Sequence, residues 1–161
     1  MLRFFDLIVK NHMQEDTRKL NFSDMALGDL SINVVARILK NNTKFSQVDL
    51  SKNCFSNEGL KQLGLVLARY NTTIVHLNIG CNHIQTDGAI SFFRSMTDHP
   101  SLVSLNMANS DCYKNKIKIG TKGAEEMQRM LQSPLCLITN LDLTDNALTV
   151  EALNYILKGM K

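Results

Sequence analysis

Histidine and cysteine are the residues of this chain best suited to metal binding or nucleophilic chemistry, and the sequence has four of each. The best-placed pair is Cys54 and His83, because each directly follows an asparagine, Asn53 and Asn82. If these segments stack on one another as adjacent strands, the two side chains would lie about 5 Å apart. Two ligands do not complete a tetrahedral zinc site, so we expect neither a metal nor another cofactor.

No catalytic set emerges from the remaining reactive residues. The other histidines, His12, His76 and His99, are far apart, and no zinc-protease motif, phosphate-binding loop or Ser-His-Asp pattern is present. The cysteines form no CxxC pair, which favours reduced thiols in a cytoplasmic protein. We therefore predict that the chain is not an enzyme. The four cysteines are Cys54, Cys81, Cys112 and Cys136.

Composition indicates one globular domain. The 161 residues are 44% apolar and 20% charged, and the net charge is only +3. So mild a charge, without a lysine or arginine block or an RNA-binding aromatic motif, argues against a nucleic-acid partner. The apolar run at the N-terminus is too short to span a membrane and lacks a cleavage site. We expect a cytoplasmic monomer that does not insert into membranes and that binds another protein.

A repeated sequence pattern places the candidate residues at equivalent positions along the chain. Asn53 aligns with Asn82, and Gly59 aligns with Gly88, when three apolar-polar-apolar triplets are superimposed. Self-similarity with a period of about 28 residues predicts a repeat architecture. The triplets are Val48-Asp49-Leu50, Leu77-Asn78-Ile79 and Leu105-Asn106-Met107.

The repeated pattern resembles the leucine-rich repeat, in the long form found in ribonuclease inhibitor, where each unit is a short strand followed by a helix. The resemblance implies an α/β solenoid, a right-handed β-α superhelix with a curved parallel sheet inside and helices outside. We predict a single domain over residues 1–161. It comprises a capping helix at 1–16 and repeats at 17–44, 45–73, 74–101, 102–137 and 138–161.

Alternation along each strand separates core positions from surface positions. Because a strand has period two, Val48, Leu50, Leu77 and Ile79 are expected to point inward. The asparagines that follow, Asn53, Asn82 and Asn146, are predicted to form a ladder that bonds free backbone groups of adjacent loops. The polar residues between the core positions face outward on the concave side and are candidate partner contacts: Gln47, Asp49, His76, Asn78, Asn106, Asn140 and Asp142.

Each expected helix opens with a hydroxyl residue and carries one apolar stripe. Ser56, Thr86 and Thr149 are predicted N-caps, since a hydroxyl oxygen can accept from the free N–H groups of the first turn. Apolar residues spaced by three and four follow, as expected for helices packed on a sheet. In the last helix this stripe is Ala152, Leu153, Ile156 and Leu157.

The fourth repeat contains an insert at residues 108–116, on the rim where strand passes to helix. The insert and its continuation combine a tyrosine with lysines, which suits contact with an acidic partner. A solvated loop without a binding role is the alternative. The candidate contact residues are Tyr113, Lys114, Lys116, Lys118 and Lys122.

Asparagine also marks the turns from helix to strand. Asn21, Asn41 and Asn71 begin Asn-x-Ser/Thr sequences, which would carry glycans in a secreted protein. We favour a role in turns, because asparagine and threonine form local side-chain-to-backbone hydrogen bonds there.

These observations predict a non-catalytic protein-interaction module or scaffold. Repeats of this kind also occur in GTPase-activating factors of the Ran-GAP type, but the resemblance gives no catalytic residue to transfer. A fragment of a larger leucine-rich-repeat receptor or bacterial effector is a third possibility. The chain's arginines mostly fall in expected helices: Arg37, Arg69, Arg94 and Arg129.

Overall fold

The computed structural model describes residues 18–110 and 117–160 and shows alternating strands and helices. The capping helix expected at residues 1–16 lies outside the described residues. The elements are β1 (Lys19–Asn21), α2 (Asp29–Leu39), β2 (Gln47–Asp49), α3 (Asn57–Tyr70), β3 (His76–Asn78), α4 (Thr86–Met96), β4 (Ser104–Asn106), α5 (Gly120–Gln132), β5 (Asn140–Asp142) and α6 (Val150–Gly159).

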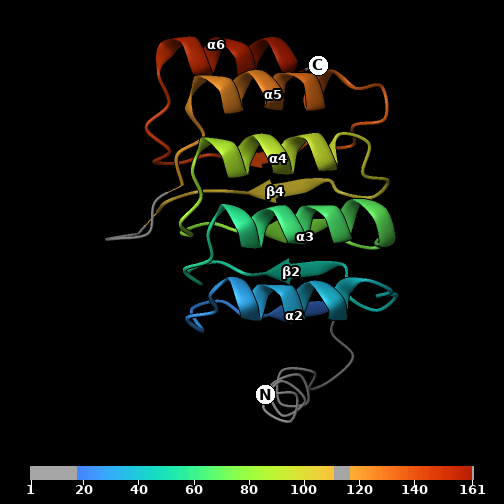
Figure 1. Cartoon of the computed structure of the whole chain (residues 1–161). Helices are drawn as coiled ribbons and strands as arrows, with labels where there is room; N and C mark the ends of the chain where they lie inside the picture. Colours follow the sequence, from blue (N-terminus) through green and yellow to red (C-terminus); the bar gives the residue numbers. More distant parts are fainter. Residues whose placement is uncertain (1–17, 111–116, 161) are drawn as a thin grey trace.

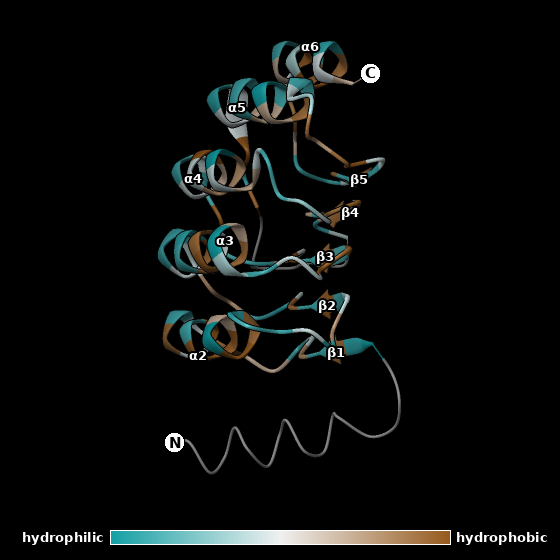
Figure 2. Ribbon diagram, turned by 90° about the vertical axis from the view of Figure 1, so that its right-hand side faces the viewer, coloured by the Kyte–Doolittle hydropathy of each residue, from teal (hydrophilic) through white to brown (hydrophobic). Residues whose placement is uncertain are grey.

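The five strands form one parallel sheet in the order of the chain, from β1 to β5. Figure 1 shows the strand-helix units stacked along one axis, and Figure 2 shows the strands on one side with the helices on the other. Pairing follows the predicted repeat register, since Val48 lies opposite Leu77 and Leu77 opposite Leu105. The predicted α/β solenoid is therefore confirmed.

The core lies between the sheet and the helices, as the alternating pattern predicted. Val48, Leu50, Leu77 and Ile79 are all buried. The stripes of α3, α4 and α5 are buried against them, including Phe92 in α4. Each fully buried leucine or phenylalanine side chain contributes about 1.5–3 kcal/mol to the hydrophobic driving force.

The last helix departs from this pattern. Ala152 and Ile156 are buried in α6, but Leu153 and Leu157 are about half exposed. An inner helix such as α4 packs against α3 on one side and α5 on the other, whereas among the described residues α6 packs extensively only on α5. The stripe is the same in sequence, but half of it has no neighbour to cover it.

Glycine occurs at a fixed point of the helices because a side chain of the preceding repeat occupies the available space. A Cβ on Gly59 would lie 2.5 Å from Asp29 Oδ1, and one on Gly88 would collide with Asn57 Oδ1. Both oxygens accept hydrogen bonds from the backbone of the next repeat. Asp29 Oδ1 accepts from Ser56 N at 2.7 Å, and Asn57 Oδ1 accepts from Gln85 N at 2.7 Å. The starts of α3 and α4 are thus bonded to the repeat before them.

Two of the three predicted helix caps are confirmed. The Ser56 side chain accepts from Glu58 N, and the Thr149 side chain accepts from Ala152 N. Thr86 is wrong as an N-cap: α4 begins at Thr86, and its N-cap is Gln85, whose side chain makes no capping bond. The Asn57 carboxamide of the preceding repeat bonds the Gln85 N–H and satisfies this end of α4 instead.

Candidate functional site

The concave sheet face is the candidate binding surface, and one row of side chains organises it. Asn21, Asp49, Asn78, Asn106 and Asp142 are aligned by strand pairing. In each, a side-chain oxygen accepts from the backbone N–H two residues later, at 2.9–3.0 Å. Such Asx turns end each strand in the same way. We call these five residues the Asx row.

Neighbouring members of the Asx row also bond to each other. Asn78 Nδ2 donates to Asp49 Oδ2 at 3.1 Å, and Asn106 Nδ2 donates to Asp142 Oδ2 at 3.1 Å. Each carboxylate also accepts a hydrogen bond from a hydroxyl group: Ser51 Oγ donates to Asp49 at 2.6 Å, and Thr144 Oγ1 donates to Asp142 at 2.7 Å. Within the described residues, neither carboxylate forms an ion pair. Hydrogen bonds therefore join these members of the Asx row in pairs, and the amides and hydroxyls that donate to its two carboxylates are neutral groups.

Two shallow hollows lie on this face. One, of about 290 Å³, is lined by Gln47, Asp49, His76 and Asn78 among others. The second, of about 230 Å³, lies over Gly80 and Ala108. A Cβ on Gly80 would lie 2.6 Å from the Ala108 carbonyl oxygen, so only glycine fits there. The short side chains at these two positions open the surface beside the Asx row.

The candidate contact residues differ in how much they are already engaged. Gln47 is half-buried, and His76 and Asn140 are exposed. None of these three side chains forms a hydrogen bond with another described residue, so they are available to a partner. Asp49, Asn78, Asn106 and Asp142 keep spare acceptor or donor capacity but already hold the turns.

A ladder of buried asparagines joins the loops behind the sheet. Asn53 Nδ2 donates to Phe22 O at 2.7 Å, Asn82 Nδ2 to Leu50 O at 3.1 Å and Asn146 Nδ2 to Met107 O at 2.8 Å. In each case the acceptor belongs to the preceding repeat. The side-chain oxygen of Asn82, Oδ1, also accepts from Asn53 N at 3.0 Å, which links two members directly.

The fourth repeat uses an asparagine that sequence alignment missed. Asn109 is buried, accepts from Ile117 N at 2.7 Å and donates to Ile117 O at 2.9 Å. It therefore holds the two described ends of the insert region together. Asn109 stands one residue before the position that aligns with Asn53 and Asn82, so the register gave no signal.

A second row of turn-forming side chains lies at the opposite edge, where helix passes to strand. Asn42 Oδ1 accepts from Phe45 N at 2.8 Å, and Asn71 Oδ1 accepts from Ile74 N at 3.0 Å. His99 Nδ1 occupies the same place and accepts from Leu102 N at 3.2 Å. Asn71 is buried and its amide donates to Leu39 O, which supports the turn interpretation over glycosylation at this position.

His99 takes the place of asparagine in this row but leaves one ring nitrogen without a partner among the described residues. Its side chain is buried, and Nε2 has no hydrogen-bond partner among the described residues. Burial disfavours the charged imidazolium and lowers the pKa of His99 from 6.5 to about 4. Among the described residues, the other one with a clearly shifted pKa is Arg94, whose pKa is raised by its hydrogen bond to Glu126. Neither residue belongs to the concave face.

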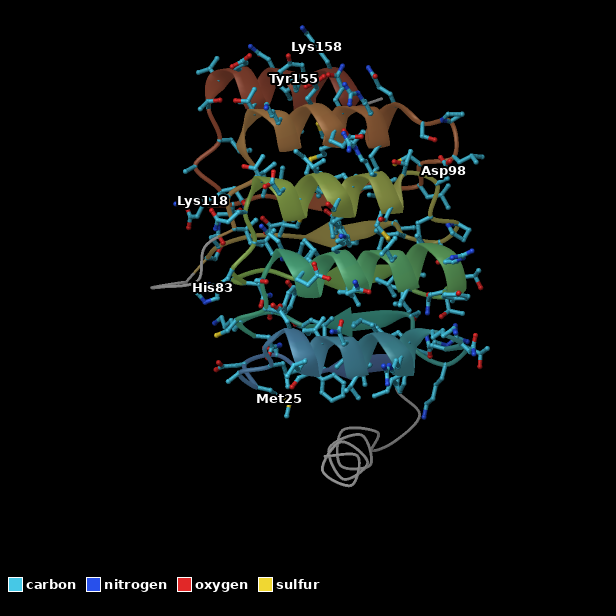
Figure 3. The ribbon with its side chains drawn as sticks, in the orientation of Figure 1. Met25, His83, Asp98, Lys118, Tyr155 and Lys158 are labelled. Atoms are coloured by element: carbon cyan, nitrogen blue, oxygen red, sulfur yellow. The ribbon has the colours of Figure 1, made fainter. Side chains whose placement is uncertain are left out.

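The rim where strand passes to helix carries the described part of the insert's continuation. Tyr113, Lys114 and Lys116 lie outside the described residues. Lys118 and Lys122 are exposed. Figure 3 shows Lys118 on the same edge as His83, and Lys118 N donates to Ile84 O at 2.8 Å.

The described residues contain no group of three or more potential metal ligands. Cys54 and His83 are both exposed, and no third ligand joins them there. Cys81 is disulfide-bonded, which corrects the expectation of reduced thiols at this position. Cys112 lies outside the described residues. The arginines Arg37, Arg69, Arg94 and Arg129 all lie on helices.

Comparison with known proteins supports the repeat assignment. A family model described as "Leucine Rich repeat" matches residues 41–64 and 70–93. No curated protein matches the sequence. None of the described helices is both long enough and apolar enough to cross a membrane.

Two solved structures share the fold over nearly the whole chain. One is described as "Leiomodin-1 Actin-Binding Site 2 (ABS2)", with a TM-score of 0.70 and 20% identity, covering 96% of this chain and 88% of that one. The other is a tropomodulin C-terminal domain from Caenorhabditis elegans, with a TM-score of 0.67 and 14% identity, covering 96% and 89%. The matched repeats and the five-stranded parallel sheet show that the chain contains leucine-rich repeats folded as an α/β solenoid, and the two solved structures share that fold.

Proposed function

We propose that the chain is a non-catalytic, cytoplasmic protein-interaction module that acts as a monomer and uses its concave sheet face to bind another protein. The observation that carries the proposal is the Asx row. Its hydrogen bonds hold one polar side chain at the end of each of the five strands in the same conformation. A surface that is already ordered loses little conformational entropy when a partner binds.

Gln47, His76 and Asn140 are the residues proposed to give specificity on this face. Gln47 and His76 lie opposite each other on β2 and β3, beside the larger hollow. The Asx row supplies the two carboxylates of Asp49 and Asp142 and the amides of Asn78 and Asn106. Lys118 and Lys122, together with Tyr113, Lys114 and Lys116, are proposed to extend the contact at the rim.

Actin is the first partner to test. The motivation is the shared fold with a leiomodin-1 region described as an actin-binding site, over 96% of this chain. A GTPase-activating role has less support, because the arginines on α2 to α5 lie on the helical side of the molecule rather than on the concave face.

The test compares wild type with Gln47→Ala/His76→Ala, which shortens two concave side chains without removing any hydrogen bond between described residues. Lys61→Ala/Lys158→Ala, at exposed positions of α3 and α6, is the matched control. Circular dichroism melting checks that all three fold alike. Binding to monomeric and filamentous actin is measured by fluorescence anisotropy and co-sedimentation.

We expect the concave variant to bind actin about tenfold more weakly and the helical control to bind like wild type. Absence of actin binding by wild type would exclude actin as the partner. Equal binding by all three proteins would exclude this part of the concave face. Lys118→Ser/Lys122→Ser tests the rim in the same assays, and accelerated GTP hydrolysis in a panel of small GTPases would instead favour the GTPase-activating alternative.

A further inference from the structure

Charge is unevenly distributed between the two edges of the first two described repeats. Residues 18–73 contain four acids, Asp24, Asp29, Asp49 and Glu58. Asp29 and Glu58 lie in the first turns of α2 and α3, and Asp49 lies on the concave face. The opposite edge, where helices end and chains return to strands, carries exposed cations and no acid from this range.

We call this surface the basic edge: Arg37, Lys40, Lys44, Arg69 and Tyr70. Arg37 and Arg69 lie in the last turns of α2 and α3, and Lys40 is the C-cap of α2. All four cations are exposed, and none forms an ion pair with a described residue. Four unneutralised positive charges therefore gather at the ends of two adjacent helices.

Tyr70 is the centre of the basic edge. Its side chain is 43% exposed although it ends a packed helix. Lys40 Nζ lies 4.4 Å from the ring centroid and Arg69 Cζ lies 5.9 Å from it. Lys44 Nζ lies 5.8 Å from the Phe45 ring in the same turn region. Cation–π contacts thus hold two cations against an aromatic ring that remains open to solvent.

Helix dipoles explain only part of this arrangement. A cation in the last turn of a helix interacts favourably with its negative end, which accounts for Arg37 and Arg69. Lys44 lies five residues beyond the end of α2, where the dipole has little effect. The half-exposed ring of Tyr70 is also unexplained by the dipole, since a terminal tyrosine needs no cationic neighbours.

We propose that the basic edge docks a glutamate- or aspartate-rich segment of a partner protein. Carboxylates would pair with Lys40, Lys44 and Arg69, and the guanidinium of Arg69 can bind a carboxylate through two parallel hydrogen bonds. Tyrosine and arginine are also the residue types enriched at the energetic centres of protein interfaces. This surface is separate from the concave face, so the inference does not depend on the proposed function.

The extent of the basic edge favours a protein segment over a membrane or a nucleic acid. The next turn along the same edge carries the exposed carboxylate of Asp98, which Figure 3 shows on the side opposite His83 and Lys118. A membrane surface or a polyphosphate backbone spanning the edge would meet this negative charge. A short acidic segment fits over the first two repeats without reaching it.

The experiment measures binding of a fluorescently labelled hexaglutamate peptide, short enough to cover two repeats, by anisotropy at low and at physiological salt. Wild type is compared with Lys40→Glu/Arg69→Glu and with Lys61→Glu/Lys158→Glu, which changes the net charge equally at exposed sites on α3 and α6 that are not part of the basic edge. Vesicles of phosphatidylcholine with phosphatidylserine, and a single-stranded RNA, are tested in parallel. Circular dichroism confirms that the variants are folded.

We expect at least about tenfold weaker peptide binding for Lys40→Glu/Arg69→Glu and less than about twofold change for the matched control. Tyr70→Leu, which keeps apolar bulk but removes the ring face, should weaken binding about threefold. No peptide binding by wild type, or equal loss in both charge-reversed variants, would overturn the proposal. Stronger edge-dependent binding to vesicles or RNA than to the peptide would overturn the assignment to an acidic protein segment.

Discussion

Protonation of His99 should destabilise this protein in mild acid. The folded state lowers the pKa of His99 from 6.5 to about 4, because the imidazole is buried away from water. A proton on Nδ1 would also remove the acceptor for the N–H groups of Ser101 and Leu102. The unfolded chain therefore binds this proton more readily than the folded one, so the contribution of neutral His99 is complete above pH 6.5 and is lost as the pH falls toward 4.

The expected size follows from these two pKa values. A difference of about 2.5 units corresponds to a maximum of about 3 kcal/mol. Linkage gives a loss of about 1 kcal/mol at pH 5.5 and between about 2 and 3 kcal/mol at pH 4.5. Carboxylates also titrate in this range, so the effect must be isolated with a variant.

His99→Asn is the appropriate variant, because Asn42 and Asn71 occupy the equivalent positions of the preceding turns and accept the same pair of backbone N–H groups. Asparagine does not titrate in this range. Urea unfolding of wild type and variant is measured at pH 7, 5.5 and 4.5. We expect similar stabilities at pH 7, within about 1 kcal/mol, and a growing advantage for the variant as the pH falls.

His83→Asn makes the same change at an exposed position and should follow the wild-type profile. A difference between wild type and His99→Asn that stays constant with pH would refute the reasoning. So would a wild type that gains stability relative to the variant in acid.

Two further predictions concern contacts between repeats and are measured by urea unfolding at pH 7. Asn82→Ala removes a buried carboxamide that bonds Asn53 N and Leu50 O, and it should cost about 2–4 kcal/mol, whereas Asn41→Ala at an exposed position should cost less than about 1 kcal/mol. Gly88→Ala should destabilise by about 1–3 kcal/mol despite the better helix propensity of alanine, since its Cβ would lie 2.9 Å from Asn57 Cα. Gly28→Ala meets no atom within 4 Å of the new Cβ and should cost less than about 1 kcal/mol, because its only penalty is the poorer N-cap preference of alanine. A stabilised Gly88→Ala protein, or equal losses in the two asparagine variants, would contradict the geometry.

The regular part of the fold followed from the sequence because two periodicities coincide in it. Alternation within Val48-Asp49-Leu50 assigned inward and outward faces, and repetition of the triplet placed the strands side by side. The buried asparagines were also predictable, since Asn53 and Asn82 recur in the same register and a buried amide requires partners. Asn109 escaped this reasoning because the irregular fourth repeat displaces it by one residue from that register.

The sequence by itself determined the repeat, the strand register and the inward-facing core of this leucine-rich-repeat protein, because these depend on spacing along the chain. Only the tertiary structure decided which equivalent positions differ in environment. Leu153 is about half exposed where its counterparts are covered, because among the described elements α6 has a helix, α5, packed on one side only. Lys40 and Tyr70 are 30 residues apart in sequence, but Lys40 Nζ lies 4.4 Å from the centroid of the Tyr70 ring, since stacking brings successive helix ends together. A surface formed by residues from different repeats depends on that packing, and no local pattern encodes it.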